Sequence, residues 1–298
     1  IDVIIGFGGG SSMDVAKLIA LLAHTNQQQN LSEIYGINQA HAPRLALILI
    51  PTTAGTGSEV TPISIVTTGT TTKMGVVSPV LYADIAILDA TFTQNLPSHI
   101  TAATGIDAMV HAIEAYTSHV KKNIYADMLA KNALLLLNQN LSKVLQNGAD
   151  LEARQNMLLG SMLAGQAFAN APVGAVHALA YPLGGHFHLS HGHSNALVLV
   201  EVLKFNVPKA KQYYAELMQL LDPRSTGCVD GLCDLFIDHM QNHLQQSGLC
   251  LKLKDLDIAK SKLPQLAKDA MLQTRLLQNN PREMTEHDVL KIYQAIYA

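Results

Sequence analysis

The sequence is poor in the residues and patterns that mark several classes of protein. It contains no tryptophan, and charged residues make up 14% of its 298 positions. No apolar run reaches the roughly 18 residues that a membrane-crossing helix needs, so we expect no membrane partner. The net charge is −3, and lysines and arginines form no stripe that would bind phosphates. We therefore expect no nucleic-acid partner.

Cysteine is scarce as well. Cys228, Cys233 and Cys250 all lie in the C-terminal part of the chain. An odd number of cysteines at these spacings fits neither a disulfide framework nor a zinc knuckle. We therefore expect the protein in the reducing cytoplasm. Hydrophobic residues, by contrast, make up 48% of the sequence, which favours a folded chain with a large core over a disordered one.

Two segments carry residues that bind metals. Asp107 and His111 stand four positions apart in TGIDAMVHAIEAY, an alanine-rich segment that we expect to be helical. This spacing places both side chains on one helix face, about 6 Å apart along the axis. His177 lies on a second segment of helical character, and His191 follows what we expect to be a loop opened by Pro182. One carboxylate and three imidazoles are suitable ligands for one divalent cation.

Each of these residues also has an ordinary structural interpretation. Asp107 suits the positive end of a helix, and His111 suits a buried position with a hydrogen-bond partner. Glu114 we interpret as an ordinary surface or capping residue. Taken singly, the structural interpretations are the better ones, and only the four residues together favour a metal site.

The chain changes character near residues 96–97. Before this point, the sequence alternates between strands and helices: VIIGF and RLALILIP are apolar runs typical of parallel strands that are buried on both faces. Between them, Ser11 and Ser12 are expected to cap a helix that begins with MDVAK. After it, segments with helical periodicity continue to the end of the chain. We predict an α/β domain over residues 1–96 and an all-helical domain over residues 97–298.

Two loops of the first domain suit a nucleotide. GFGGGSSMDVAK joins a strand to a helix, so its glycines allow an anion to approach the backbone N–H groups at the helix start. PTTAGTGSEVT follows the next strand, and Thr52, Thr53 and Ser58 are possible hydrogen-bond donors to a phosphate or an amide. Ligands bind beyond the carboxyl ends of the strands in open α/β sheets. Close packing of strand on helix, or an ordinary Ser/Thr turn, is the competing explanation.

At this point the motifs resemble those of the iron-containing (group III) alcohol dehydrogenase family. The matching segments extend from the start of the chain to its end and are GGGSSMDVAK, PTTAGTGSEVT, PSHITAATGIDAMVHAIEAY, HALAYPLGGHFHLSHGHSNAL and NPREMTEHDVLKIYQAIY. Because each motif is long and their order is preserved, the resemblance is specific. It implies a partial Rossmann-like nucleotide domain followed by a helical metal-binding domain, a fold of the dehydroquinate synthase-like type.

The resemblance also implies roles for individual residues. The metal ligands would be Asp107, His111, His177 and His191, and the pyrophosphate of NAD or NADP would be bound by Gly9, Gly10 and Ser11. Asp14, Thr52 and Thr53 would contact the nicotinamide side, and Lys73 would lie near the cofactor ribose.

Three features separate the chain from typical family members. Tyr181 stands where many members have a histidine with a proton-relay role, so Tyr181 is our catalytic candidate, with packing as the alternative. Ser190 replaces the proline that usually precedes the last ligand histidine. Members carry further residues before the first glycine-rich strand, so we interpret the chain as N-terminally truncated and leave the choice between NAD and NADP open.

The chemistry expected of this family is hydride transfer between a small alcohol or aldehyde and the nicotinamide ring. A divalent cation lowers the pKa of a bound alcohol and polarises a carbonyl. Four protein ligands leave no free position on a tetrahedral zinc ion, which favours Fe(II), with Zn(II) as the alternative. A zinc polyol dehydrogenase of the glycerol type and a non-catalytic metal-binding fragment are the competing functions. The resemblance further implies a homo-oligomer.

Overall fold

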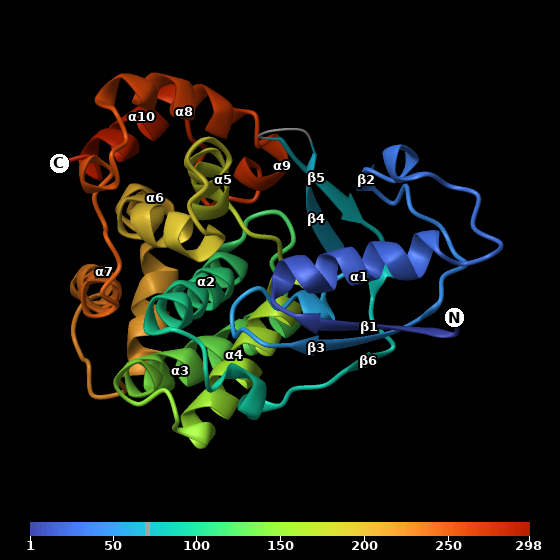
Figure 1. Cartoon of the computed structure of the whole chain (residues 1–298). Helices are drawn as coiled ribbons and strands as arrows, with labels where there is room; N and C mark the ends of the chain where they lie inside the picture. The colour runs from blue at the N-terminus through green and yellow to red at the C-terminus, as the bar shows by residue number, and fades with distance from the viewer. Residues whose placement is uncertain (69–71) are drawn as a thin grey trace.

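The computed structural model describes residues 1–68 and 72–298 and, of residues 72 and 73, the backbone alone. An α/β part with two small sheets forms one side of the molecule, and a group of long helices forms the other (Figure 1). In the described part of the chain, no helix is both long and apolar enough to cross a membrane.

The first sheet is parallel and carries the glycine-rich loop. Its strands are β1 (Val3–Gly8), β3 (Ala46–Pro51) and β6 (Ile85–Ala86), in the order β1-β3-β6. Helix α1 (Gly10–Leu22) packs on one face, where Met13 and Ala20 are fully buried. The close approach requires Gly6, because a Cβ atom there would lie 2.6 Å from Leu49 and 2.7 Å from Ala16.

The opposite face of this sheet is open, which differs from the sequence prediction. Val3, Ile5 and Phe7 alternate along β1 on this face, and Ile5 is 57% exposed. In the described part of the chain, Phe92 of η4 packs edge-on against Phe7 at 4.9 Å between ring centroids, and Val3, Ile5 and Phe7 remain 41–57% exposed. The continuous apolar run therefore predicted the parallel strand correctly but not its burial, because burial depends on what packs over each face.

The second sheet lies beside α1. Its strands, in the order β2-β5-β4, are β2 (Gly36–Ile37), β5 (Thr72–Val77) and β4 (Ile63–Thr68). β4 and β5 are antiparallel neighbours, and β2 pairs with β5 in parallel. Short 3₁₀ turns connect the α/β elements: η1 (Leu31–Glu33), η2 (Ser58–Val60), η3 (Pro79–Leu81) and η4 (Ala90–Thr93).

The helical part is organised around α2 (Ser98–Thr117). Every residue of α2 from Gly105 to Thr117 is buried, because α3, α4 and α6 surround it. A helix that is buried on all sides must place its polar residues inside the protein. The remaining helices are α3 (Ile124–Gln146), α4 (Leu151–Asn170), α5 (Ala175–Phe187), α6 (His191–Leu221), α7 (Val229–Gln246), α8 (Leu263–Met271), α9 (Thr274–Leu277) and α10 (Glu286–Ala295), with the 3₁₀ turns η5 (Lys254–Leu256) and η6 (Lys260–Lys262).

Two details of the helix predictions are wrong. Helix α1 begins at Gly10 with Gly9 as its N-cap and no side-chain cap, so Ser11 and Ser12 do not cap it. Pro182 does not open a loop, because α5 continues through it to Phe187. A proline inside a helix costs roughly 3 kcal/mol, and the complete burial of Leu179 and Leu183 on this helix offsets that cost.

The change from strands to long helices falls between η4 and α2, near the predicted boundary at residues 96–97. The division into domains of residues 1–96 and 97–298 remains a prediction, because the positions of the elements do not show whether either part folds alone.

The close contact between β1 and α1 generates the first testable prediction. Gly6→Ala should destabilise the protein by about 1–3 kcal/mol, because the added methyl group overlaps Leu49 and Ala16. The measurement is the urea unfolding midpoint. Gly231→Ala is the matched control, since a Cβ atom there would meet its nearest neighbour at 3.7 Å. Equal midpoints for the two variants would contradict the prediction.

Candidate active site

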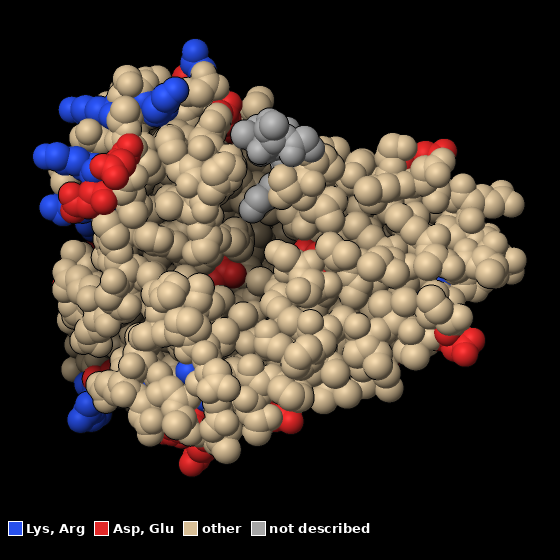
Figure 2. Space-filling view, viewed as in Figure 1, with Lys and Arg blue, Asp and Glu red and all other residues tan. Residues whose placement is uncertain are grey.

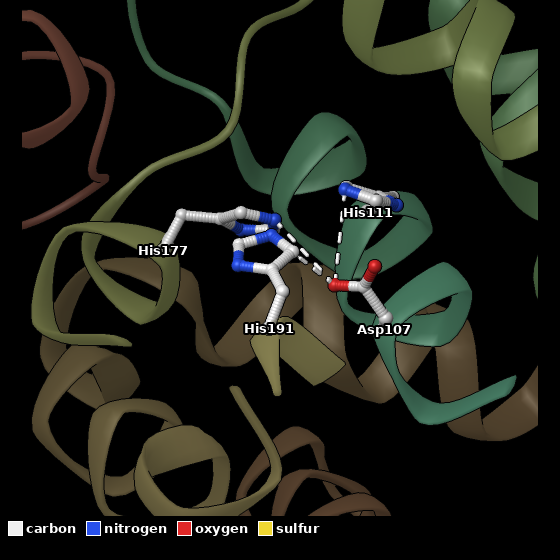
Figure 3. A group of neighbouring side chains, drawn as sticks. All are labelled: Asp107, His111, His177 and His191. Atoms are coloured by element: carbon white, nitrogen blue, oxygen red, sulfur yellow. Dashed lines mark ion pairs between the residues drawn. The ribbon is translucent and has the colours of Figure 1, made fainter. Parts of the chain in front are cut away.

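The four predicted metal ligands lie together, although they come from three helices. Helix α2 supplies Asp107 and His111, α5 supplies His177, and His191 is the first residue of α6 (Figure 3). One ligand atom from each residue can be chosen so that all four lie within 4.8 Å of one another. Asp107, His111 and His177 are buried, whereas the His191 side chain is 31% exposed. The exposed edge gives a substrate access to the group.

The distances centre on one carboxylate oxygen. Asp107 Oδ1 lies 3.6 Å from His191 Nε2, 3.8 Å from His177 Nε2 and 4.0 Å from His111 Nε2 (Figure 3). Two atoms that bind one cation at about 2.0–2.2 Å lie roughly 3.3–4.3 Å apart. These separations from Asp107 therefore suit a single shared ion.

Hydrogen bonds direct two of the imidazoles. His177 Nδ1 lies 2.6 Å from Glu114 Oε2, and the other oxygen of Glu114 accepts from the backbone N–H of Val176 at 2.7 Å. His111 Nδ1 lies 3.2 Å from the carbonyl oxygen of Gly55. Both acceptors place the ring proton on Nδ1, so the Nε2 lone pairs of His111 and His177 face the group.

The charge states suit a cation. Burial lowers the pKa of His111 to about 3, so its imidazole is neutral at pH 7. Burial also opposes ionisation of Asp107, but His111, His191, His177 and a hydrogen bond from Asn195 together hold the pKa of Asp107 below its ordinary value. A carboxylate beside a neutral imidazole is the protonation state in which these groups bind metal.

The donor atoms of this group suit a divalent cation. Its donors are one oxygen and three nitrogens, which both Fe(II) and Zn(II) accept. In addition, Asn195 Oδ1 is buried beside this group and finds no hydrogen-bond partner among the described residues. A buried, negatively charged group of ligands with an unsatisfied oxygen beside it is a suitable environment for a cation.

A cleft joins this group to the glycine-rich loop. Figure 2 shows the hollow between the α/β part and the helical part. The cavity has a volume of about 360 Å³. Its lining includes Gly10, Ser11, Asp14, Thr56, His111, His177, Tyr181, His191 and Arg275. The nucleotide loop and the metal-ligand group thus share one space.

The start of α1 has the features that the sequence analysis expected of an anion-binding site. Gly10 and Ser11 line the cavity at the first turn, which has no side-chain cap. The free N–H groups and the positive end of the helix favour an anion there. A Cβ atom on Gly10 would lie 2.7 Å from Thr56, so the two predicted loops meet at this point.

Asp14 has a structural role that the sequence analysis did not identify. Its carboxylate accepts from the hydroxyl of Ser58 at 2.6 Å and from the backbone N–H of Ile65 at 2.9 Å. Lys17, which is fully buried, donates to Ser58 at 2.8 Å and to the carbonyl of Ile63 at 2.7 Å. These contacts join α1 to η2 and β4 and fix the shape of the cleft wall.

Other predicted residues lie less directly on the cleft. Gly9 is the N-cap of α1, and a Cβ atom there would lie 3.6 Å from Thr53. Thr52 and Thr53 are half-buried beside this loop, and neither lines the cavity. Lys73 lies in β5, but its side chain is outside the described part of the chain.

Tyr181 lies where the sequence analysis predicted, one turn after His177 on α5. It lines the cavity, and its ring centroid is 5.9 Å from that of His191. Burial raises the pKa of Tyr181, and the positive charge of Arg275 opposes this shift only in part. The phenol therefore keeps its proton at neutral pH.

Two residues of the metal-ligand group were missed. Glu114, which we interpreted as a surface or capping residue, is buried and holds His177. Its position seven residues after Asp107 on an apolar helix was the available signal. Asn195 follows His191 by one turn of α6 and is also buried against Asp107. Each residue lies one or two helical turns from a proposed ligand, and this spacing places it on the same helix face as that ligand.

Comparison with known proteins gives a consistent result. Residues 1–90 match the family described as iron-containing alcohol dehydrogenase, and residues 101–297 match the C-terminal part of the Fe-containing alcohol dehydrogenase family. Long-chain-alcohol dehydrogenase 1 of Geobacillus thermodenitrificans (strain NG80-2) is 42% identical over 299 residues, which is 100% of this chain and 75% of the relative.

Solved structures give the same result. A 1,3-propanediol oxidoreductase matches with a TM-score of 0.94 at 33% identity, over 99% of this chain and 77% of its own. A sulfoacetaldehyde reductase from Bifidobacterium kashiwanohense, solved in complex with NAD+, matches with a TM-score of 0.88 at 29% identity, over 100% of this chain and 76% of its own.

The hydrogen bond between Glu114 and His177 leads to a prediction about metal affinity. Glu114→Gln should weaken metal binding by roughly 10–100-fold, because the amide no longer orients and polarises the imidazole as a carboxylate does. The affinity is measured by competition between the protein and a chelator for Zn(II). Glu201→Gln, on the exposed Glu201–Lys204 pair, is the control. Equal affinities for both variants would show that Glu114 does not support the site.

Buried Glu59 leads to a prediction about pH. Burial raises the pKa of Glu59 to about 7 from an ordinary value of 4.5. The folded protein therefore holds a proton that the unfolded chain has released between these values. The resulting stabilisation is complete below about pH 4.5 and is lost as the pH rises through about 7.

Glu59→Gln should remove this dependence. Between about pH 5 and pH 8, the wild type should lose on the order of 1–3 kcal/mol of unfolding free energy relative to the variant. Urea unfolding at both pH values measures the difference, with exposed Glu283→Gln as the control. Parallel pH profiles for wild type and Glu59→Gln would rule out the shifted titration.

Proposed function

Because this chain belongs to the iron-containing alcohol dehydrogenase family, we propose that it transfers hydride between a small alcohol or aldehyde and NAD at the cleft described above. The observation that carries the proposal is the meeting of the two halves of the reaction in one cavity. The lining includes Gly10 and Ser11 of the nucleotide loop together with His111, His177 and His191.

We assign metal binding to Asp107, His111, His177 and His191. The proposal is supported by their separations, by the neutral state of His111 and by the charge of Asp107. When bound, the cation would lower the pKa of an alcohol hydroxyl or polarise a carbonyl. We propose iron, in line with the family, and keep zinc as the alternative. The comparisons do not favour the glycerol-type alternative.

We assign cofactor binding to the first turn of α1 and its surroundings. Gly9, Gly10 and Ser11 would receive the pyrophosphate, because a helix start with free N–H groups attracts phosphate. Asp14, Thr52 and Thr53 would border the nicotinamide side, with Lys73 near the ribose. The relative solved with NAD+ supports NAD as the cofactor, and NADP is the alternative.

Tyr181 is the proposed proton carrier. Its protonated phenol lines the cavity beside His191, so its Oη proton is available to an oxygen of the substrate during reduction. In the oxidation direction the hydroxyl would orient the alcohol by accepting its proton in a hydrogen bond. This assignment requires direct contact with the substrate, which places Tyr181 among the catalytic residues of the proposal.

Two wider features complete the proposal. We propose a homo-oligomer, as the family resemblance implies. We also propose the cytoplasm as the compartment. The second point is supported by Cys228, Cys233 and Cys250, which are all free thiols in the structure.

The proposal predicts separable losses in a metal-ligand variant. Asp107→Asn should abolish stoichiometric Fe(II) binding and lower alcohol oxidation by at least about 100-fold, because the site loses its only ligand charge. NADH binding, followed by fluorescence, should remain within about threefold of the wild type, because the nucleotide loop lies on the other side of the cleft. His99→Ala, at an exposed position, is the control.

Three results would contradict parts of this proposal. Full activity of Asp107→Asn would remove the metal from the reaction. Failure of the wild type to bind NADH would remove the nucleotide assignment and favour a non-catalytic metal-binding fragment. Activity of the wild type on glycerol, with no activity on simple primary alcohols, would favour a polyol dehydrogenase of the glycerol type.

A further inference from the structure

Asn195 occupies an unusual position within the metal-ligand group. It lies one turn after His191 on α6 and is completely buried. Its Nδ2 donates to Asp107 Oδ1 at 2.6 Å, and the same nitrogen lies 3.3 Å from His177 Nε2 and 3.5 Å from His191 Nε2. One amide nitrogen therefore contacts three of the four proposed ligand atoms.

The other end of the same amide has no partner. Asn195 Oδ1 is buried and, within the described part of the chain, accepts no hydrogen bond. An unsatisfied buried acceptor is destabilising, and buried polar atoms without a partner are rare in folded proteins. In this orientation the amide nitrogen contacts the ligand atoms, and the amide oxygen is left without a hydrogen bond.

The orientation follows from the charges around it. The group contains the Asp107 carboxylate and His177 Nε2, whose lone pair faces the group because Nδ1 is hydrogen-bonded to Glu114, so it favours the donor end of an amide. A cation that takes up these lone pairs leaves Nδ2 with fewer acceptors, and its positive charge repels the amide N–H groups. The same cation attracts an amide oxygen, which is a ligand that hard and borderline metal ions accept.

We propose that Asn195 is a positioning residue of the metal centre and that its amide group reorients when the cation binds. In the metal-free protein, Nδ2 holds Asp107, His177 and His191 together in place of the ion. With the ion present, the side chain rotates and Oδ1 faces the cation, which satisfies the oxygen that now lacks a partner. This inference rests on the proposed function, because it requires the same four ligands to bind a metal.

The test compares two substitutions at one position. Asn195→Leu removes both ends of the amide at similar volume, and Asn195→Asp removes the donor but keeps an oxygen. Affinity for Zn(II) is measured by chelator competition, and the melting temperature is measured with and without Zn(II). Asn206→Leu is the control, because Asn206 is a buried amide on the same helix that pairs with Asn280 instead.

The expected results differ between the variants. Asn195→Leu should bind Zn(II) roughly 10–100-fold more weakly than the wild type. Asn195→Asp should bind at least as tightly as the wild type, yet its metal-free form should melt at a lower temperature, since two carboxylates then face each other. Asn206→Leu should melt lower with unchanged affinity.

Two outcomes would overturn the inference. Affinity of Asn195→Leu within threefold of the wild type would show that the amide only fills space. Equal weakening in Asn195→Leu and Asn195→Asp would show that the donor end matters and that the oxygen does not face the ion. Absence of saturable Zn(II) binding in the wild type would contradict the proposed function itself. The wild type therefore tests the proposed function, and the variants test the role of Asn195.

Discussion

The structure depends on keeping one carboxylate charged inside the helical part. Asp107 is 2% exposed and is surrounded by imidazoles and by the amide of Asn195. A buried charge without compensation costs several kcal/mol, so the surrounding helices must bring partners to it. Helices α2, α5 and α6 meet at this point, and in the proposed function a cation is the partner that compensates the charge.

Close backbone contacts allow this meeting. Gly192 follows His191 at the start of α6, and a Cβ atom there would lie 2.0 Å from the carbonyl oxygen of Ala103 on α2. Only a glycine lets α6 approach α2 closely enough for His191 to reach Asp107. The polypeptide backbone therefore determines the metal-ligand geometry as much as the ligand side chains do.

The same principle connects the two parts of the molecule. Gly55, in the loop after β3, accepts from His111, and a Cβ atom on this residue would lie 2.7 Å from Thr104 of α2. Gly57 adopts a positive φ of 59° and approaches the backbone of Gly165 on α4. The loop after β3 is thus fixed against α2 and α4 by direct contact. In the proposed reaction, this contact would hold the cofactor and the metal at the fixed, short separation that hydride transfer requires.

Much of the fold and of the site could be predicted from the sequence. The motifs identified the family, and the fold class is confirmed by the solved relatives. The spacing of Asp107 and His111 placed them on one face, because local periodicity reports local geometry. The structure brings His177 and His191 to them, in agreement with the predicted group.

The remaining features depend on tertiary contacts. The spacing of seven residues from Asp107 indicates that Glu114 shares its helix face, but the burial of Glu114 depends on the helices that pack around α2. Pro182 does not open the predicted loop, because the packing that preserves α5 around it is not visible in the local sequence. The open face of β1 has the same explanation, because an apolar strand does not specify its neighbours.

X-ray absorption at the iron edge of Fe(II)-loaded protein tests the central claim most directly. The claim predicts one iron per chain with three imidazole nitrogens and at least one oxygen at roughly 2.0–2.2 Å. Iron bound without imidazole scattering, or with one histidine only, would show that these four side chains do not share an ion.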